Sequence, residues 1–357
     1  MQRLQGLPVL ARARRLAVVG CVVALAAIVG CGGSDEGGET AGTATAGAAA
    51  AADLTDVRLQ LDWIPKEEYG FLYGAKEEGI FEKHGIDLTL NPGKGSVLAM
   101  QVLNGGAADM AYVNVASYVQ ALGEGAQGIA VYGIIQQDPQ MIVSFEDDPV
   151  NTIKDLAGKT LITSSTEGFA LYYPYLFEQN GLDPESVTVR RVDSSAKAAT
   201  FASGKGDSVN LYQTQSIAPL EEQAGKTFVR LPSQDWEAGQ LNVAENLIVL
   251  PEYLEANEDT VRKMTAALAE AWEWAEANPE AAAKAIQPML ANAPLEQVQE
   301  TVETSLSLGH TPASEGKATG WMAPEDWDAT IKNLTASGLV EEAKPATDYY
   351  TNDYIDG

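Results

Sequence analysis

Residues 57–61 read Val-Arg-Leu-Gln-Leu and residues 86–90 read Ile-Asp-Leu-Thr-Leu, and both alternate apolar with polar side chains. This alternation predicts two β-strands. The stretch between them, from Tyr69 to His84, has the pattern of a helix and ends at Gly85. A strand, a helix and a second strand in this order predict a parallel sheet with a right-handed crossover.

The same alternation of strands and helices continues along the chain. The further expected elements are a helix over 96–104 and strands over 110–113, 160–163, 187–192 and 208–211. From Pro251 onward the pattern is mostly helical and includes a long segment over 259–277. We therefore expect an α/β chain with two lobes, each a mainly parallel sheet flanked by helices, and a helical C-terminal region. The expected boundaries are 54–146 and 251–357 for lobe 1, and 147–250 for lobe 2.

The N-terminus has a basic start with four arginines and an apolar run from Leu16 to Val29, followed by Ile-Val-Gly-Cys at residues 28–31. This layout predicts a secretory signal peptide over 1–30. The small residue before Cys31 resembles the site at which bacterial lipoproteins are lipidated and cut. We predict a mature protein outside the cytoplasmic membrane, anchored by lipid on Cys31. The alternative is an ordinary signal peptide followed by a chance cysteine.

Residues 31–53 consist mainly of Gly, Ser, Thr and Ala with a few acidic residues. Such a composition cannot bury enough apolar surface to offset the entropy of ordering. We predict a flexible tether between the anchor and the folded part.

The composition excludes several classes of function. The chain has 50 acidic and 23 basic side chains and a net charge of −27, which argues against nucleic acid and anionic lipid as partners. Both cysteines, Cys21 and Cys31, precede the folded part, and His84 and His310 lie far apart. Thiol catalysis and cysteine or histidine metal sites are therefore not expected. No set of nucleophile, base and orienting residue is visible. We expect no catalytic residue, no metal and no cofactor, and we expect a monomer.

At residues 61–65, Leu-Asp-Trp-Ile-Pro, the sequence resembles the opening of periplasmic solute-binding proteins of the thiamine-precursor and riboflavin type, which are related to the sulfonate and nitrate binders. Residues 70–81, 85–88 and 104–111 are similar to later family motifs in order and spacing. The resemblance implies the type II periplasmic binding protein fold, a ligand between the lobes and the permease of an ABC importer as partner. The family usually has Asn and His where this chain has Lys66 and Tyr69, which leaves the identity of the ligand open.

Ligands of open α/β sheets lie beyond the carboxyl ends of the strands, and this rule selects the candidate site. The candidate ligand-binding residues are Asp62, Trp63, Tyr69, Asn114, Ser117, Ser164, Ser165, Thr166, Glu167, Asn210 and Tyr212. Trp63 offers a flat face to a heterocycle, unless it is a core anchor. Ser164 to Thr166 suit either helix capping or ligand contact. Glu167 suits a ligand amine or ring N–H, or simply the dipole of the following helix.

These residues predict a binding protein, not an enzyme. The expected ligand is a small planar heterocycle, such as a thiamine-pyrimidine precursor or riboflavin. The alternatives are a sulfonate or another small organic anion admitted by Lys66, although a solvated Lys66 is the simpler expectation. The resemblance also leaves open a thiamine-pyrimidine synthase-like enzyme, disfavoured because the cysteine motif is missing, and a sensor that binds the same ligand without transport.

Overall fold

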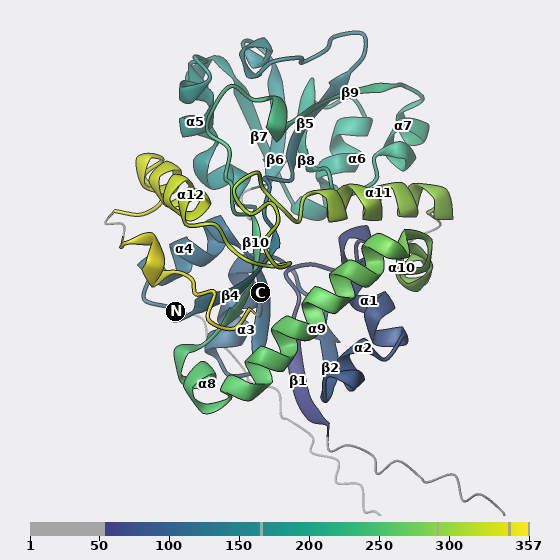
Figure 1. Ribbon diagram of the computed structural model, residues 1–357. Helices are drawn as coiled ribbons and strands as arrows, with labels where there is room; N and C mark the ends of the chain where they lie inside the picture. The colour runs from purple at the N-terminus through teal and green to yellow at the C-terminus, as the bar shows by residue number, and fades with distance from the viewer. Residues whose placement is uncertain (1–53, 165–166, 291–292, 342–343, 356–357) are drawn as a thin grey trace, which may run out of the picture. The chain divides into compact units, whose positions relative to one another are not determined.

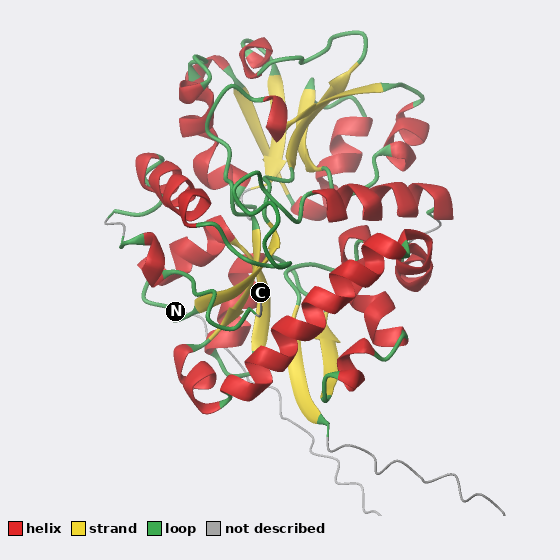
Figure 2. Ribbon diagram, viewed as in Figure 1, coloured by secondary structure: helices red, strands yellow, loops and turns green. Residues whose placement is uncertain are grey.

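The computed structural model describes residues 54–355 except 165–166, 291–292 and 342–343. The predicted signal peptide, tether and Cys31 lie outside the described residues. The described residues form a single contact unit, and their strands build two five-stranded sheets. Figure 2 shows both sheets with helices on their flanks. The expected α/β fold with two lobes is confirmed.

The first sheet has the strand order β2-β1-β3-β10-β4. Its strands are β1 (Thr55–Gln60), β2 (Ile86–Asn91), β3 (Met110–Asn114), β4 (Ile129–Ile135) and β10 (Glu245–Val249). Strand β1 runs parallel to both neighbours, whereas β10 is antiparallel to β3 and β4.

The second sheet has the order β7-β6-β8-β5-β9. Its strands are β5 (Gln140–Phe145), β6 (Thr160–Ser164), β7 (Thr188–Val192), β8 (Ser208–Tyr212) and β9 (Phe228–Pro232). Strand β5 is antiparallel to β8 and β9, and β6 is parallel to β7 and β8. Both sheets are therefore mixed. In each of them the strand that follows a crossover from the other sheet, β10 or β5, is antiparallel to its neighbours.

The chain crosses between the sheets at residues 136–139 and 233–244. Strand β5 belongs to the second sheet and β10 to the first, so the expected lobe boundaries at 146 and 251 are each misplaced by one strand. Both strands are buried along their whole length. A fully buried strand shows no alternation, and its sequence does not tell which sheet it joins. The two crossovers are tied together at Asp138, whose carboxylate accepts hydrogen bonds from the N–H groups of Gln140 at 3.0 Å and Leu241 at 3.2 Å.

The helices precede, connect or cover these strands. They are α1 (Gly70–Glu77), α2 (Ile80–Lys83), α3 (Ser96–Asn104), α4 (Val115–Gly123), α5 (Phe169–Gln179), α6 (Lys197–Ala202), α7 (Ala218–Ala224), α8 (Pro251–Ala256), α9 (Glu258–Ala277), α10 (Pro279–Ile286), α11 (Leu295–Ser307) and α12 (Pro324–Ala336). The single helix expected over 69–84 is wrong in one respect: Gly79, at φ +75°, separates α1 from α2.

The core of the first lobe lies between its sheet and the long helix α9 (Figure 1). Trp272 of α9 is 1% exposed and contacts Phe71 of α1 with ring centroids 4.9 Å apart. Gly309 lies so close to the indole of Trp272 that a Cβ there would be 2.4 Å from it. This packing fixes α9 and the segment at Gly309 on the first lobe, whereas α12 also contacts Tyr175 of α5 in the second lobe through Asn333. Among the described helices none is long and apolar enough to cross a membrane.

Candidate functional site

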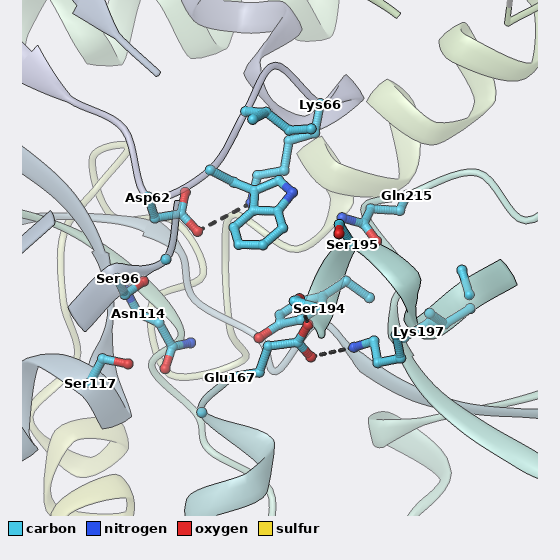
Figure 3. A pocket seen from close by; sticks show the side chains of 17 residues that line it. Asp62, Lys66, Ser96, Asn114, Ser117, Glu167, Ser194, Ser195, Lys197 and Gln215 are labelled. Atoms are coloured by element: carbon cyan, nitrogen blue, oxygen red, sulfur yellow. Dashed lines mark hydrogen bonds and ion pairs between the residues drawn. The ribbon is translucent and has the colours of Figure 1, made fainter. Parts of the chain in front are cut away.

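A cavity of about 270 Å³ is lined by residues of both lobes (Figure 3). The first lobe contributes Asp62, Trp63, Ile64, Lys66, Gly95, Ser96, Asn114 and Ser117. The second lobe contributes Glu167, Gly168, Ser194, Ser195, Lys197, Ala198, Leu211, Tyr212 and Gln215. These residues follow the carboxyl ends of β1, β3, β7 and β8 or stand at the starts of α3 to α6. The cavity therefore lies where the sequence rule for α/β sheets places a ligand.

The loop after β1 holds Trp63 at the cavity wall. The N–H of Trp63 donates to the hydroxyl oxygen of Tyr69 at 3.1 Å, and its carbonyl accepts from Gly93 N–H at 2.9 Å. Gly93 tolerates this close approach because it has no side chain, since a Cβ there would lie 2.0 Å from the Leu61 carbonyl oxygen. Trp63 itself is half-buried and is not part of the core clusters. The core-anchor interpretation of Trp63 is therefore wrong.

Tyr69 does not line the cavity, which corrects the expectation that its ring contacts the ligand. The ring is buried and packs edge-on against Tyr112, with centroids 5.5 Å apart. The Tyr69 hydroxyl donates a hydrogen bond to the Asp62 carboxylate. Burial and the nearby carboxylates raise the pKa of Tyr69 well above its usual value, so the hydroxyl keeps its proton and remains a donor. Tyr69 thus positions Asp62 and the backbone of Trp63.

Lys66 lies at the centre of a buried cluster of ionisable groups, and the expectation that it is solvated is wrong. It is 7% exposed, and its Nζ lies 3.1 Å from Glu68 Oε1 and 3.6 Å from Asp62 Oδ2. Glu68 also accepts a hydrogen bond from the Tyr112 hydroxyl. Burial disfavours the charge on Lys66, but the surrounding carboxylates outweigh this effect and raise its pKa.

Glu245 at the start of β10 completes this cluster from the sheet side. Its Oε1 accepts a hydrogen bond from Asn114 Nδ2 at 3.2 Å. Burial raises the pKa of Glu245 well above its usual value, and the neighbouring carboxylate of Asp62 raises it further. Burial also raises the pKa of Asp62. These carboxyl groups have a stronger affinity for protons than they would have in water.

The second lobe presents a balanced pair of charges. Lys197 is 4% exposed and forms an ion pair with Glu167, which also accepts a hydrogen bond from the Ser194 hydroxyl. Burial lowers the pKa of Lys197, while Glu167 opposes that effect. The Lys197 Nζ lies 5.9 Å from the ring centroid of Tyr212. Glu167 therefore has a specific cationic partner at the cavity and is not only a helix-dipole residue.

The two lobes approach closely at Asn114. Its Oδ1 accepts a hydrogen bond from Ala116 N–H at 3.0 Å and caps α4. Its N–H donates to the Ser96 hydroxyl oxygen at 3.1 Å. Gly168, before α5 in the second lobe, comes so near that a Cβ there would be 2.8 Å from Asn114 Oδ1. A larger side chain at Gly168 would push the lobes apart at the cavity.

The structure brings six of the predicted residues together at the cavity wall: Asp62, Trp63, Asn114, Ser117, Glu167 and Tyr212. Ser164 and Asn210 are buried and do not line it. Asn210 instead bridges strands, accepting from the Thr163 hydroxyl at 2.7 Å and donating to Gln140 Oε1 at 2.9 Å. Ser165 and Thr166 lie outside the described residues.

Sequence reasoning missed several residues of the cavity wall. They include Ser96, Ser194, Ser195, Lys197 and Gln215. The signal for three of them was present, because Ser194, Ser195 and Lys197 follow the strand expected over 187–192. The rule that selected Asp62 after the first strand would have selected these residues too. The sequence indicated Lys66 only as a contact for an anionic ligand, and a solvated side chain was the simpler expectation because lysine is seldom buried.

Three comparisons bear on the chain as a whole. A family model described as NMT1/THI5 like matches residues 66–282, which is more than half of the chain. The protein YtlA of Bacillus subtilis strain 168 is 29% identical over 213 residues, covering 58% of this chain. The match covers 63% of YtlA, so the chain spans less than two thirds of that relative. A formylaminopyrimidine-binding protein of Halalkalibacterium halodurans is 23% identical over 304 residues, covering 84% of this chain and 90% of the relative.

A solved structure shows the same fold. The alkanesulfonate-binding protein SsuA of Xanthomonas axonopodis pv. citri, bound to MOPS, superposes with a TM-score of 0.66 at 16% identity. The match covers 84% of this chain and 99% of SsuA. The two sheets with their helices thus form the periplasmic binding protein fold, as the sequence resemblance implies.

Proposed function

Because the chain belongs to the NMT1/THI5-like family, we propose that it is an extracytoplasmic solute-binding protein that delivers a small planar heterocycle to an ABC importer. The ligand would bind in the cavity lined by both lobes. Closure of the lobes around it would present the loaded shape to the permease.

The position of the Trp63 side chain carries this proposal. Trp63 lines the cavity together with Asp62 of the first lobe and Glu167 of the second, both of which are labelled in Figure 3. An indole face stacks on flat rings, and carboxylates accept hydrogen bonds from ring N–H and amino groups. A relative named for binding formylaminopyrimidine is consistent with such a ligand. A planar ring with N–H donors at its edge suits all three side chains at once.

An anionic ligand suits the cavity less well. Its two lysines are already paired, Lys66 with Asp62 and Glu68, and Lys197 with Glu167. A sulfonate would have to compete with these carboxylates for the same ammonium groups. The likeness to the alkanesulfonate-binding protein supports the fold and does not extend to the ligand.

An enzyme of the thiamine-pyrimidine synthase type is also disfavoured. Neither cysteine nor histidine is among the residues found to line the described cavity wall. Its lysines are held by carboxylates, and a paired ammonium group is a poor nucleophile. The residues of the cavity wall therefore suit a protein that binds its ligand better than an enzyme that converts it.

We further propose that lipid on Cys31 anchors the protein to the outer face of the cytoplasmic membrane. The support is the sequence layout of residues 1–31. Cells fed an alkyne fatty acid should label the wild type, and Cys31→Ser should lose the label. Wild-type protein that takes no label and appears free in the medium would contradict the anchor.

The solute itself is best identified on protein purified from its own host. Mass spectrometry of the material released on unfolding should find a heterocyclic compound. Titration followed by tryptophan emission should then show binding of 4-amino-5-hydroxymethyl-2-methylpyrimidine or riboflavin, and none of taurine. A protein that binds taurine and neither ring compound would overturn the proposal in favour of an anion binder.

A further inference from the structure

Among the ionisable groups at the cavity and directly behind it, the carboxyl groups outnumber the ammonium groups. Four carboxyl groups belong to this set, those of Asp62, Glu68, Glu167 and Glu245, against the two ammonium groups of Lys66 and Lys197. Glu68, Glu245 and both lysines are at least nine-tenths buried, and the side chains of Asp62 and Glu167 are each 13% exposed. An unpaired charge is costly at such sites, so the excess of two negative charges must be relieved.

The excess is confined to the first lobe. Glu167 and Lys197 of the second lobe cancel each other, whereas Lys66 faces three carboxyl groups. One oxygen of Glu68 and one of Glu245 have no hydrogen-bond partner among the described residues. Glu245 is 2% exposed and is therefore shielded from bulk solvent.

In the protein without ligand, this excess of buried negative charge favours the protonated form of the carboxyl groups. The charged and titratable groups that act on Glu245 are Asp62, Lys66 and Glu68, and it acts in turn on the hydroxyls of Tyr69, Tyr112 and Tyr212. Only Lys66 among them is a cation. Burial and the adjacent carboxylate raise the pKa of Glu245 well above its usual value, so this carboxyl group holds a proton more readily than it would in water.

We propose that the ligand of this cavity carries one positive charge beside Asp62, and that its binding releases a proton from the cluster of Asp62, Glu68 and Glu245. The inference rests on the proposed function, because it specifies the charge of the heterocycle. A cation close to these groups stabilises their ionised forms, so the carboxyl proton of Glu245 passes to solvent while the ligand charge replaces it.

Asp62 is the group that meets the ligand. Its side chain lines the cavity and is 13% exposed, while Glu68 and Glu245 lie behind the wall. Asn114 also lines the cavity and donates to Glu245, so it lies between the ligand and the hidden carboxyl group. The face of Trp63 adds a further surface that attracts cations.

Two probes of equal shape test the charge. They are 4-amino-2-methylpyrimidines that carry either a trimethylammoniomethyl or a 2,2-dimethylpropyl group at C5, so that they differ by one fixed positive charge. We expect the cation to bind the wild type tighter by on the order of tenfold or more. The ratio of the affinities for the cationic and the neutral probe should shrink in Asp62→Asn. It should persist in Asp56→Asn, the control, because Asp56 is exposed on β1.

Proton release is measured by calorimetric titration of the cationic probe at one pH in buffers with different ionisation enthalpies. The wild type should release a measurable fraction of a proton, up to one per ligand, and Glu245→Gln should release clearly less. Thermal melts establish that each variant is folded.

Equal or tighter binding of the neutral probe by the wild type would overturn the inference and leave the heterocycle-binding function standing. Release that is absent in the wild type, or unchanged in Glu245→Gln, would overturn the proton-coupled part. If the wild type binds neither probe nor any other ring compound, the proposed function fails and the inference fails with it.

Discussion

The two walls of the cavity differ in how their buried charges are paired. The first-lobe wall surrounds Lys66 with the carboxyl groups of Asp62, Glu68 and Glu245. The Tyr69 hydroxyl donates a hydrogen bond to Asp62, and the Tyr112 hydroxyl donates one to Glu68. The second-lobe wall matches one glutamate with one lysine. The first wall therefore depends on a single cation, while the second is a pair that can be removed as a unit. In the second wall, two substitutions can remove both charges of the pair together. In the first wall, removing Lys66 leaves three carboxyl groups, and removing one carboxyl group leaves two.

The largest effect is expected for Lys66→Met, which leaves three buried carboxyl groups without a cation. The free energy of unfolding at pH 7 should fall by about 3–5 kcal/mol, measured by urea denaturation. Lys284→Met is the matched control, because Lys284 is exposed and pairs only with Glu280 one helical turn away, and its effect should stay below about 0.5 kcal/mol.

The loss in Lys66→Met should shrink as the pH falls from 7 to 5. Lys66 lowers the pKa values of Asp62 and Glu245, which burial raises, so loss of Lys66 raises both further. The folded variant therefore takes up more protons than the folded wild type as the pH falls. The free energy of unfolding of the variant thus rises relative to that of the wild type. A loss that is the same at both pH values would show that the carboxyl groups are not the cause.

The second wall should respond differently to loss of its lysine. Lys197→Met alone should lower the free energy of unfolding by about 3 kcal/mol, because Glu167 is left buried without its partner. The double variant Glu167→Gln and Lys197→Met should recover most of that loss, as the charges disappear together. The double-mutant cycle is measured by urea denaturation. If the double variant is as unstable as the sum of the single ones, the two side chains act independently and the contrast between the walls is wrong.

Trp63→Ala should weaken binding more than folding. Loss of the stacking surface is expected to cost about 1–3 kcal/mol of binding free energy for the heterocycle. The melting temperature should change little, since the indole is half-buried at the cavity and lies outside the core clusters. Calorimetric titration and thermal melts separate the two quantities. A badly destabilised variant that binds normally when folded would remove Trp63 from the site.

The smallest effect is expected for Ser194→Ala, which removes one hydrogen bond to Glu167 and leaves the ion pair with Lys197 in place. A cost of about 0.5–1.5 kcal/mol in the free energy of unfolding follows from the loss of one such bond. Ser195→Ala is a neighbouring control, because the Ser195 hydroxyl donates to Asp193 on the surface. Equal costs for both variants would show that Glu167 needs no support from Ser194.

The sequence predicted the elements whose pattern is local. Alternating side chains marked β1 and β2, and strand ends pointed to Asp62, Trp63, Asn114 and Glu167, which the structure places around one cavity. The resemblance of Leu-Asp-Trp-Ile-Pro and the later motifs to a known family implied the periplasmic binding protein fold, because these motifs are short stretches of adjacent residues. These conclusions needed no knowledge of distant contacts.

Tertiary structure alone decided the roles of Lys66 and Tyr69 and the sheet that β10 joins. Lys66 and Glu245 are far apart in the sequence, yet both belong to the buried cluster at Asp62. Tyr69, directly before α1, packs its ring against Tyr112 and donates its hydroxyl hydrogen bond to Asp62, so it does not reach the ligand space. The physical reason is burial: the charge state of a lysine or carboxyl group depends on which other charges share its low-dielectric surroundings, and only the folded chain determines those neighbours.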